Sequence, residues 1–276
     1  QINGKTVTFG ATDAPVAGDK LTANGQVQFP AIIGGTIPVF NLEGFKPGEL
    51  RVTGEILAEM FMGYIVNWND PKIAALNPGK KFPDQTITVA HRADGSGTTF
   101  NFTDYLTTVS KLWAEKVGKG AAVKWPAASS LGGKGNEGVA ANVARVKGSV
   151  GYVEYAYAKK NNIPYFSLQN KDGKFVRPDD KTFAAAAADA DWFSVPGMGL
   201  SIVNQKGNDS WPISTASFII MYKDPSDKKA SQEAIKFFDW AFKNGKQAAL
   251  ELDYVPLPDI LTKQIREKVW NQINNK

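Results

Sequence analysis

The stretch 92–100, which reads Arg-Ala-Asp-Gly-Ser-Gly-Thr-Thr-Phe, constrains the fold more than any other part of the chain. It follows residues 86–90, an alternating β-branched run that predicts a strand, and it leads into residues 100–106, whose apolar side chains recur at helical spacing. A short turn between a strand and a helix places the unpaired N–H groups and the positive dipole end of the helix beside the strand end. The sequence therefore predicts an α/β arrangement with a polar loop at the carboxyl end of a strand.

This loop carries the residue types that bind a small oxyanion. Gly95 and Gly97 permit a tight turn and a close approach of the backbone to a ligand, while Ser96 and Thr98 add hydroxyl donors. Arg92 supplies a permanent charge and a fork of donors that suits tetrahedral oxyanions. We therefore interpret the loop as a candidate anion site at a helix start.

An ordinary helix cap would use many of the same residues, because Ser, Thr and Gly are preferred at helix starts whatever the protein does. Asp94, two residues after Arg92, favours the anion site, since a carboxylate there can hold the guanidinium in position. A fixed cation beside a helix start is more than a cap requires. Local chemistry alone leaves the anion site and the ordinary cap about equally supported.

The composition narrows the class of protein. The chain has 276 residues, enough for one large domain or two medium ones, and it contains no cysteine, which excludes disulfides and thiolate metal sites and suits an exported bacterial protein. We find no apolar run of membrane-spanning length and no signal peptide at Gln1, so we expect a processed or trimmed soluble chain. The net charge of +5 comes from scattered lysines, which predicts no nucleic-acid partner but would help to attract a small anion.

The single histidine, His91, limits the catalytic chemistry. A Ser-His-Asp triad would need it to serve Ser96 on the same loop, and no nucleophile-elbow motif surrounds that serine. Zinc sites usually draw on several His or Cys ligands. We therefore expect a protein that is not an enzyme, with no catalytic residues, no metal and no cofactor, and we expect His91 to mark a partly exposed strand end.

A literal GxGxxG begins at Gly133, but the residues before it, 125–130, look like a loop rather than the buried strand that a dinucleotide site requires. We therefore reject a dinucleotide site. The glycines are interpreted as a flexible turn ahead of a helix over 137–146, with a secondary role in lining the anion cleft as an alternative.

Near the start of the chain, residues 6–11 predict a short strand, and Asp13 at its end has the place of an ordinary turn residue. Residues 27–33 and 36–40 predict two further strands around a Gly-Gly pair, and their prolines favour edge or irregular positions. Helices and strands alternate through the rest of the chain. Ligands of open α/β sheets lie at the carboxyl ends of strands, which is where Asp13 and the arginine loop both fall.

With both loops identified, the chain resembles the phosphate-binding proteins of bacterial high-affinity phosphate ABC transporters, which are periplasmic substrate-binding proteins. The resemblance rests on five motifs spread over essentially the whole chain: FGATDAP at 9–15, RADGSGT at 92–98, LGGKGN at 131–136, GYVEYA at 151–156 and KFFDWA at 236–241. It implies an α/β, two-lobed fold of the type II substrate-binding kind. The expected first lobe is 1–40 plus 210–276, and the expected second lobe is 41–209.

The resemblance assigns phosphate binding to five residues: Asp13, Arg92, Ser96, Gly97 and Thr98. Asp13 would accept a hydrogen bond from the protonated phosphate, the others would donate, and Asp94 would hold Arg92 in place. Sulfate carries no proton and would face Asp13 as an unpaired like charge, so a site of this kind can reject it by roughly 10⁴-fold or more. Arsenate, of similar shape and protonation, should be poorly excluded.

The implied function is capture of phosphate in the periplasm by a monomer and its delivery to the membrane permease of an ABC transporter. Family members begin with a further segment ahead of the position of Gln1, so we expect a first lobe that is incomplete at its N-terminus. Two alternatives stay open at this point. One is a phosphatase or phosphoryl-transfer enzyme on the same fold, and the other is a surface protein that keeps the fold without the ligand.

Overall fold

The structure is a computed structural model that describes residues 1–188 and 190–274. The chain divides into two compact units. The first consists of Gln1–Gly34, Ala187–Ile202 and Thr215–Lys276, and the second of Gly35–Ala186 and Val203–Ser214. Position 189 and positions 275–276, which fall within the expected lobes, lie outside the described residues.

The units differ from the expected lobes chiefly in the segment Ala187–Ile202, which belongs to the first unit. Two contacts explain this membership. The Gln28 side-chain amide donates to the Gly197 carbonyl at 2.9 Å. Gly18 lies so close to Pro196 that a Cβ on this glycine would meet the proline carbonyl oxygen at 2.7 Å. The division into lobes at residues 40 and 210 stays a prediction.

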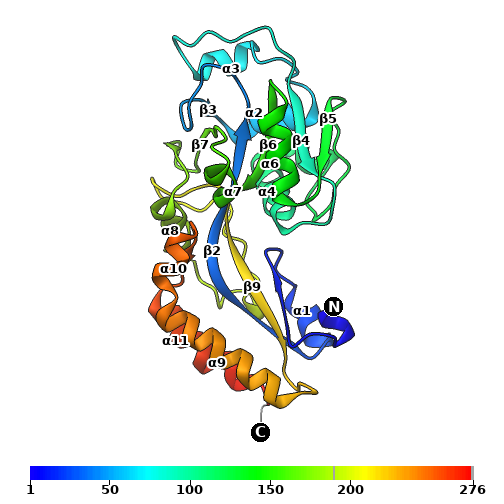
Figure 1. Cartoon of the computed structure of the whole chain (residues 1–276), viewed down its shortest axis with the longest axis vertical. Helices are drawn as coiled ribbons and strands as arrows, with labels where there is room; N and C mark the ends of the chain where they lie inside the picture. The colour runs from blue at the N-terminus through cyan, green and yellow to red at the C-terminus, as the bar shows by residue number, and fades with distance from the viewer. Residues whose placement is uncertain (189, 275–276) are drawn as a thin grey trace. The chain divides into compact units, whose positions relative to one another are not determined.

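The first unit combines antiparallel strand pairs with three C-terminal helices (Figure 1). Its elements are η1 (Ile2–Gly4), β1 (Phe9–Thr12), α1 (Gly18–Ala23), the first part of β2 (Gln26–Phe40), η2 (Pro196–Met198), most of β9 (Ser214–Tyr222), α9 (Lys228–Asn244), α10 (Lys246–Glu251), β10 (Val255–Pro256), α11 (Asp259–Lys268) and η3 (Trp270–Gln272). β1 runs antiparallel to β9, with Phe9 opposite Met221. Arg266 of α11 donates to Asp239 of α9 at 2.6 Å, which joins these two helices.

The two strands expected over 27–33 and 36–40 are one continuous strand, β2, so that prediction was wrong. The Gly-Gly pair makes room for aromatic rings rather than for a turn. A Cβ on Gly34 would lie 3.1 Å from the Tyr254 ring, and one on Gly35 would lie 2.3 Å from the Phe183 ring. The two glycines therefore allow aromatic rings to approach the strand backbone closely, which is a common reason for glycine within a strand.

The edge position expected from the prolines is also wrong. Pro38 of β2 lies opposite Tyr152 of the neighbouring antiparallel strand, and on its other side its carbonyl accepts from the Phe166 N–H at 3.3 Å. A proline is tolerated between two neighbours when only its carbonyl is needed for pairing, because it has no N–H to offer.

The second unit is an α/β layer built on parallel strands. Its elements are β3 (Arg51–Val52), α2 (Gly54–Met62), α3 (Pro71–Leu76), β4 (Thr88–Arg92), α4 (Gly97–Val109), α5 (Lys111–Lys116), β5 (Ser130–Gly133), α6 (Gly135–Arg145), β6 (Ser149–Glu154), α7 (Tyr155–Lys160), β7 (Ser167–Gln169), β8 (Phe175–Val176) and most of α8 (Asp180–Ala188). β4 lies between β5 and β6 and is parallel to both. The second part of β2 runs antiparallel to β6.

Parallel pairing places three helix starts at one edge of this sheet. α4 follows β4, α6 follows β5 and α7 follows β6, so each helix begins at the carboxyl end of a strand (Figure 1). The helices pack on a core that includes Phe61, Phe102 and Tyr152, each at most 1% exposed. The α/β class and the strand–loop–helix order expected around residues 92–100 are thereby confirmed.

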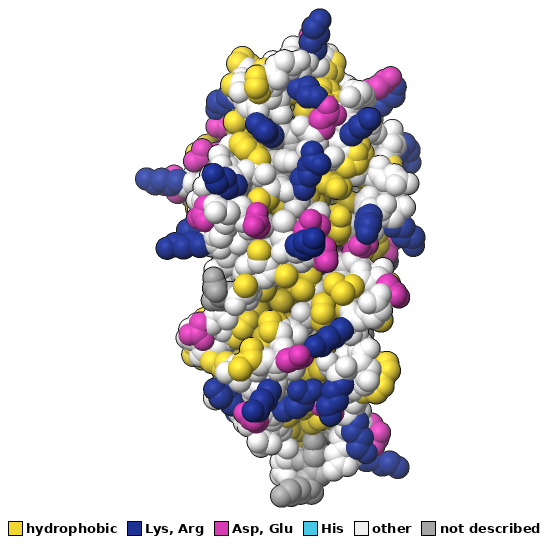
Figure 2. Space-filling model, turned by 90° about the vertical axis from the view of Figure 1, so that its left-hand side faces the viewer, with side chains coloured by type: hydrophobic (Ala, Val, Ile, Leu, Met, Phe, Trp, Pro, Cys, Tyr) yellow, Lys and Arg dark blue, Asp and Glu magenta, His cyan; other side chains and the backbone are white. Residues whose placement is uncertain are grey.

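Lys and Arg side chains are spread over the face drawn in Figure 2 and are interspersed with Asp and Glu, in line with the scattered lysines of the sequence. Within the described ranges, none of the helices combines the length and the apolar character that crossing a membrane would require.

Candidate functional site

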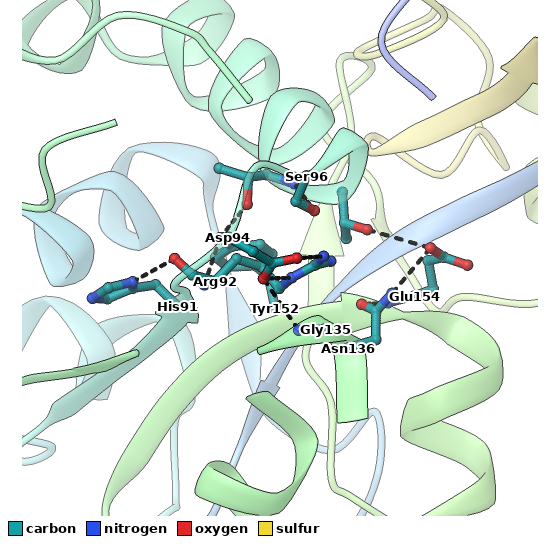
Figure 3. A network of polar contacts seen from close by, with 10 residues as sticks. His91, Arg92, Asp94, Ser96, Gly135, Asn136, Tyr152 and Glu154 are labelled. Carbon is teal, nitrogen blue, oxygen red and sulfur yellow. Dashed lines mark hydrogen bonds and ion pairs between the residues drawn. The ribbon is translucent and has the colours of Figure 1, made fainter. Parts of the chain in front are cut away.

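The centre of the candidate site is a two-point contact between Arg92 and Asp94 (Figure 3). Arg92 Nε donates to Asp94 Oδ1 at 2.8 Å, and Nη2 donates to Oδ2 at 2.6 Å. The arginine ends β4 and its side chain is 11% exposed, whereas that of Asp94 is 37% exposed. The carboxylate thus fixes the plane of the guanidinium, as the spacing of the two residues predicts.

This contact favours the charged form of both groups. The hydrogen bonds from Arg92 hold the pKa of the Asp94 carboxyl well below its usual range, against a smaller opposing effect of burial. The same bonds raise the pKa of Arg92, again against partial burial. Both side chains are therefore ionised near neutral pH.

The loop ends at the start of α4, where Ser96 is the N-cap. Its hydroxyl oxygen accepts from the Thr99 N–H at 3.2 Å, so the serine fills the cap role that the sequence leaves open. The N–H groups of Gly97 and Thr98 belong to the first helical turn, where no intrahelical acceptor exists. Ser96 and Thr98 are buried, with 6% and 3% of their residue surface exposed. The cap and an anion site are compatible at Ser96, because its hydroxyl oxygen accepts from the Thr99 N–H while its O–H is a separate donor.

Tyr152 of β6 connects the loop to the sheet through two hydrogen bonds of its hydroxyl group. The Arg92 backbone N–H donates to its hydroxyl at 3.2 Å, and the same hydroxyl shares a 2.7 Å hydrogen bond with Thr99 Oγ1. Burial raises the pKa of Tyr152 to about 12, so the phenol stays protonated and can both donate and accept. One buried side chain thus contacts the stretch 92–100 near both of its ends.

The sequence analysis did not identify Glu154 and Asn136 as neighbours of the loop. It also did not predict the contact that Gly135 makes with Asp94. Thr98 Oγ1 donates to Glu154 Oε1 at 3.3 Å, and Asn136 Nδ2 donates to the same oxygen at 3.1 Å (Figure 3). The Gly135 N–H donates to Asp94 Oδ1 at 3.1 Å. Glu154 ends β6, and Gly135 and Asn136 begin α6 just after the end of β5, so their place at the carboxyl ends of parallel strands is the signal that could have found them.

The GxGxxG segment lies in a different context from the one expected. Residues 125–129 form a loop, as expected, but residues 130–133 form β5, a short strand that leads into the segment. Gly133 and Gly138 let this strand and α6 approach closely, since a Cβ on Gly133 would lie 2.5 Å from the Gly138 carbonyl carbon. Gly135 has a φ of 69°, which favours glycine. The role in lining the anion cleft finds support in the bond from Gly135 to Asp94.

His91 lies in β4, one residue from its end, and is half-buried, as expected. Its Nδ1 forms a 2.9 Å hydrogen bond with the Arg92 carbonyl oxygen, and its ring stacks on Trp125 with 5.1 Å between ring centres. Ser96 meanwhile serves as the helix cap. The structure therefore gives both residues structural partners of their own.

Asp13 lies in the first unit, directly after β1, whereas the other predicted ligands lie in the second. The Ser217 hydroxyl of β9 donates to Asp13 Oδ1, and the aspartate is half-buried. The joint action of Asp13 and Arg92 on one ligand stays a prediction.

A cavity of about 740 Å³ lies elsewhere in the second unit and includes Arg51, Arg177 and Lys80 in its lining. Its charges are balanced: Lys80 is paired with Glu49, and the carboxylates of Asp179 and Asp209 line the same cavity. The carboxylates match the cations in number, so this cavity offers an anion no excess of positive charge. The Arg92 loop is the better candidate because a fixed guanidinium, two hydroxyls and a helix start lie together there.

The comparisons with known proteins agree with one another. A family model described as a PBP superfamily domain matches residues 1–244. The phosphate-binding protein PstS of Pasteurella multocida is 53% identical over 275 residues, with 100% of this chain and 79% of that protein covered. PstS of Haemophilus influenzae is 50% identical over 268 residues, with 97% of this chain and 80% of that protein covered. Among solved structures, a high affinity periplasmic phosphate-binding protein, PfluDING, bound with phosphate superimposes with a TM-score of 0.75 at 18% identity, covering 98% and 83% of the two chains.

Proposed function

The chain belongs to the PBP superfamily and, within it, to the family of PstS phosphate-binding proteins, and from this membership we propose that it binds inorganic phosphate and delivers it to an ABC transporter. The observation that carries the proposal is the Arg92 guanidinium, fixed by Asp94 at the start of α4 in a chain about half identical to named phosphate-binding proteins. The matching family and fold confirm the resemblance found in the sequence.

The proposed ligands are those predicted from the sequence. Arg92 would donate from the guanidinium nitrogens that Asp94 leaves available, and Ser96, Gly97 and Thr98 would add hydroxyl and backbone donors. Donors and a helix start suit any tetrahedral oxyanion, so they give affinity rather than selectivity. Selectivity for phosphate over sulfate would come from Asp13, which would accept a hydrogen bond from the P–OH group that phosphate, unlike sulfate, carries near neutral pH.

The protein is a binding protein rather than an enzyme, since relatives at about 50% identity are named for phosphate binding. Nothing in the comparisons favours the alternative of a phosphatase or a phosphoryl-transfer enzyme. The hydrogen bonds of His91 to the Arg92 carbonyl and of Ser96 to the start of α4 also argue against a serine nucleophile activated by histidine.

The cellular setting follows from the same family. We propose that the chain works in the periplasm as a monomer, that its partner is the membrane permease of an ABC transporter, and that it excludes arsenate poorly. A basic surface with interspersed carboxylates, as in Figure 2, supports attraction of a small anion over long range.

Equilibrium dialysis with labelled phosphate tests the proposal. We expect retention of phosphate that excess sulfate does not displace and that arsenate does displace, with no release of phosphate from a phosphomonoester. Steady turnover of the ester would support the enzyme instead. If the protein shows neither phosphate retention nor turnover of the ester, the result would support a surface protein that has kept the fold without its ligand.

A further inference from the structure

The first unit contains a cavity of about 380 Å³, and the residues that line it all belong to that unit. The volume falls at the lower end of the range of about 300–1,000 Å³ that is usual for small-molecule sites. The walls come from α1, from the start of β2, from the segment around η2 and from the end of α11. The cavity includes none of the residues of the proposed phosphate site.

Hydrogen bonds of Gln28 hold two of these walls together. This glutamine is 1% exposed; its Oε1 accepts from the Val16 N–H at 2.8 Å, and its Nε2 donates to the Gly197 carbonyl at 2.9 Å. Gly18 at the start of α1 lies against η2, since a Cβ there would meet the Cβ of Pro196 at 2.6 Å. These contacts fix the walls before a ligand binds, so binding would lose little free energy to rearrangement.

Apolar side chains from each of these walls line the cavity. Leu21 of α1, Val27 of β2, Met198 of η2 and Val269 after α11 are each at most 5% exposed. A ligand with an apolar body can bury it against them. Inorganic phosphate or sulfate would instead turn some of its oxygens toward groups that cannot donate a hydrogen bond, which is costly.

Two lysines give the cavity a positive charge. Lys268 and Phe193 both line it, and Lys268 Nζ lies 4.6 Å from the centre of the Phe193 ring. Lys223 lines it as well and is half-buried. Among residues 1–188 and 190–274, no aspartate or glutamate lines the cavity or forms an ion pair with either lysine. The carboxylates next to them in sequence, Asp224 and Glu267, contact other side chains.

We propose that this cavity binds a small organic carboxylate, whose apolar body lies between α1, η2 and the end of α11 and whose carboxylate lies at Lys268 and Lys223. The two features together select this class of ligand. The lysines attract an anion, and the apolar walls favour an anion that carries a hydrocarbon part. The inference goes beyond the proposed function, because it concerns a second ligand and a different set of residues.

Titration calorimetry with three probes tests the proposal. Hexanoate has both features of the expected ligand, hexanamide lacks the charge, and acetate lacks most of the apolar body. We expect saturable binding of hexanoate with a dissociation constant of roughly 1 mM or lower, about fivefold weaker binding of hexanamide and at least about tenfold weaker binding of acetate. Absence of saturable hexanoate binding, or equal affinity for all three probes, overturns the proposal.

A matched pair of variants locates the charge that acts on the probe. Lys268→Met keeps an apolar stem and removes the ammonium group, and we expect hexanoate to bind about fivefold more weakly. Lys236→Met causes the same change in net charge, but Lys236 lies on α9, does not line the cavity and has a side chain that is 70% exposed, so the affinity should stay unchanged. An equal effect of the two variants, or none in Lys268→Met, overturns the assignment.

Two further measurements locate the probe itself. In amide NMR spectra, hexanoate should shift the signals of Leu21 and Gly197, which lie in opposite walls of the cavity, and unshifted signals would overturn the proposal. An excess of inorganic phosphate should leave the hexanoate affinity unchanged. Displacement by phosphate would place the probe at the Arg92 loop and overturn the second site, without touching the proposed function.

Discussion

Replacement of Arg92 by alanine gives the most direct measure of the anion site. The guanidinium has five N–H donors, and Asp94 uses two of them, one on Nε and one on Nη2. Three remain, of which two at most can reach one small anion in a bidentate contact. Each charge-assisted hydrogen bond contributes about 1.5–3 kcal/mol, so their loss should weaken phosphate binding by about 4 kcal/mol, or roughly 10³-fold.

Arg92→Lys separates charge from geometry. Lysine keeps the unit charge but cannot bond both Asp94 oxygens and the anion through a planar fork, so we expect an affinity between those of the alanine variant and the unaltered protein. Arg145→Ala is the matched control, because Arg145 is the last residue of α6 and donates to the Asn142 side chain, whereas the loop lies at the start of that helix.

Titration calorimetry measures these affinities, and circular dichroism verifies that each variant is folded. The reasoning is refuted if Arg92→Ala binds phosphate within about threefold of the unaltered protein, since charge-assisted bonds of this kind cannot be so weak. A loss of the same size in Arg145→Ala would also refute it, because it would assign the effect to net charge rather than to the fixed guanidinium.

Three further predictions concern other residues of the two units. Asp13→Asn should narrow the preference for phosphate over sulfate, and an unchanged ratio in competition binding would count against its acceptor role. Because the folded-state pKa of Asp94 is lowered, its charge stabilises the fold above its unfolded pKa and this contribution is lost as the pH falls through the folded value. The difference in free energy of unfolding between the unaltered protein and Asp94→Asn should therefore shrink as the pH falls below about 4, and a difference that stays constant across this range in urea titrations would contradict the assignment. Gly133→Ala should lower the free energy of unfolding by about 1–3 kcal/mol, because its Cβ would meet backbone atoms of Gly138 and Val139 at 2.5 Å; an unchanged urea midpoint would show that β5 and α6 can separate freely.

The sequence predicted well those elements whose conformation depends on residues close together in the chain. The β-branched run before residue 92, the Gly- and Ser-rich turn and the helical spacing after residue 100 each determine local conformation, and β4 and α4 lie within two or three residues of the expected positions. The pairing of Arg92 with Asp94 was also predictable, because opposite charges two residues apart on one short loop lie within reach of each other.

Features that depend on distant partners were not predictable in the same way. The Gly34-Gly35 pair has the composition of a turn, and only the rings of Tyr254 and Phe183 show why glycine is needed within a strand. Segment 187–202 belongs to the first unit through contacts with residues near position 18, which no local pattern reveals. The position of Glu154 beside the loop was not predicted, because a charged residue between a strand and a helix usually faces water.

Asp94 accepts both from the arginine and from the backbone at the start of α6, and this sharing has a consequence for how distant relatives are interpreted. A homologue could conserve the arginine and yet lose its orientation if an insertion or deletion displaced the turn between β5 and α6. An alignment that checks only for the arginine would then assign the wrong ligand. The more reliable diagnostic is joint retention of the aspartate and of a glycine at position 135.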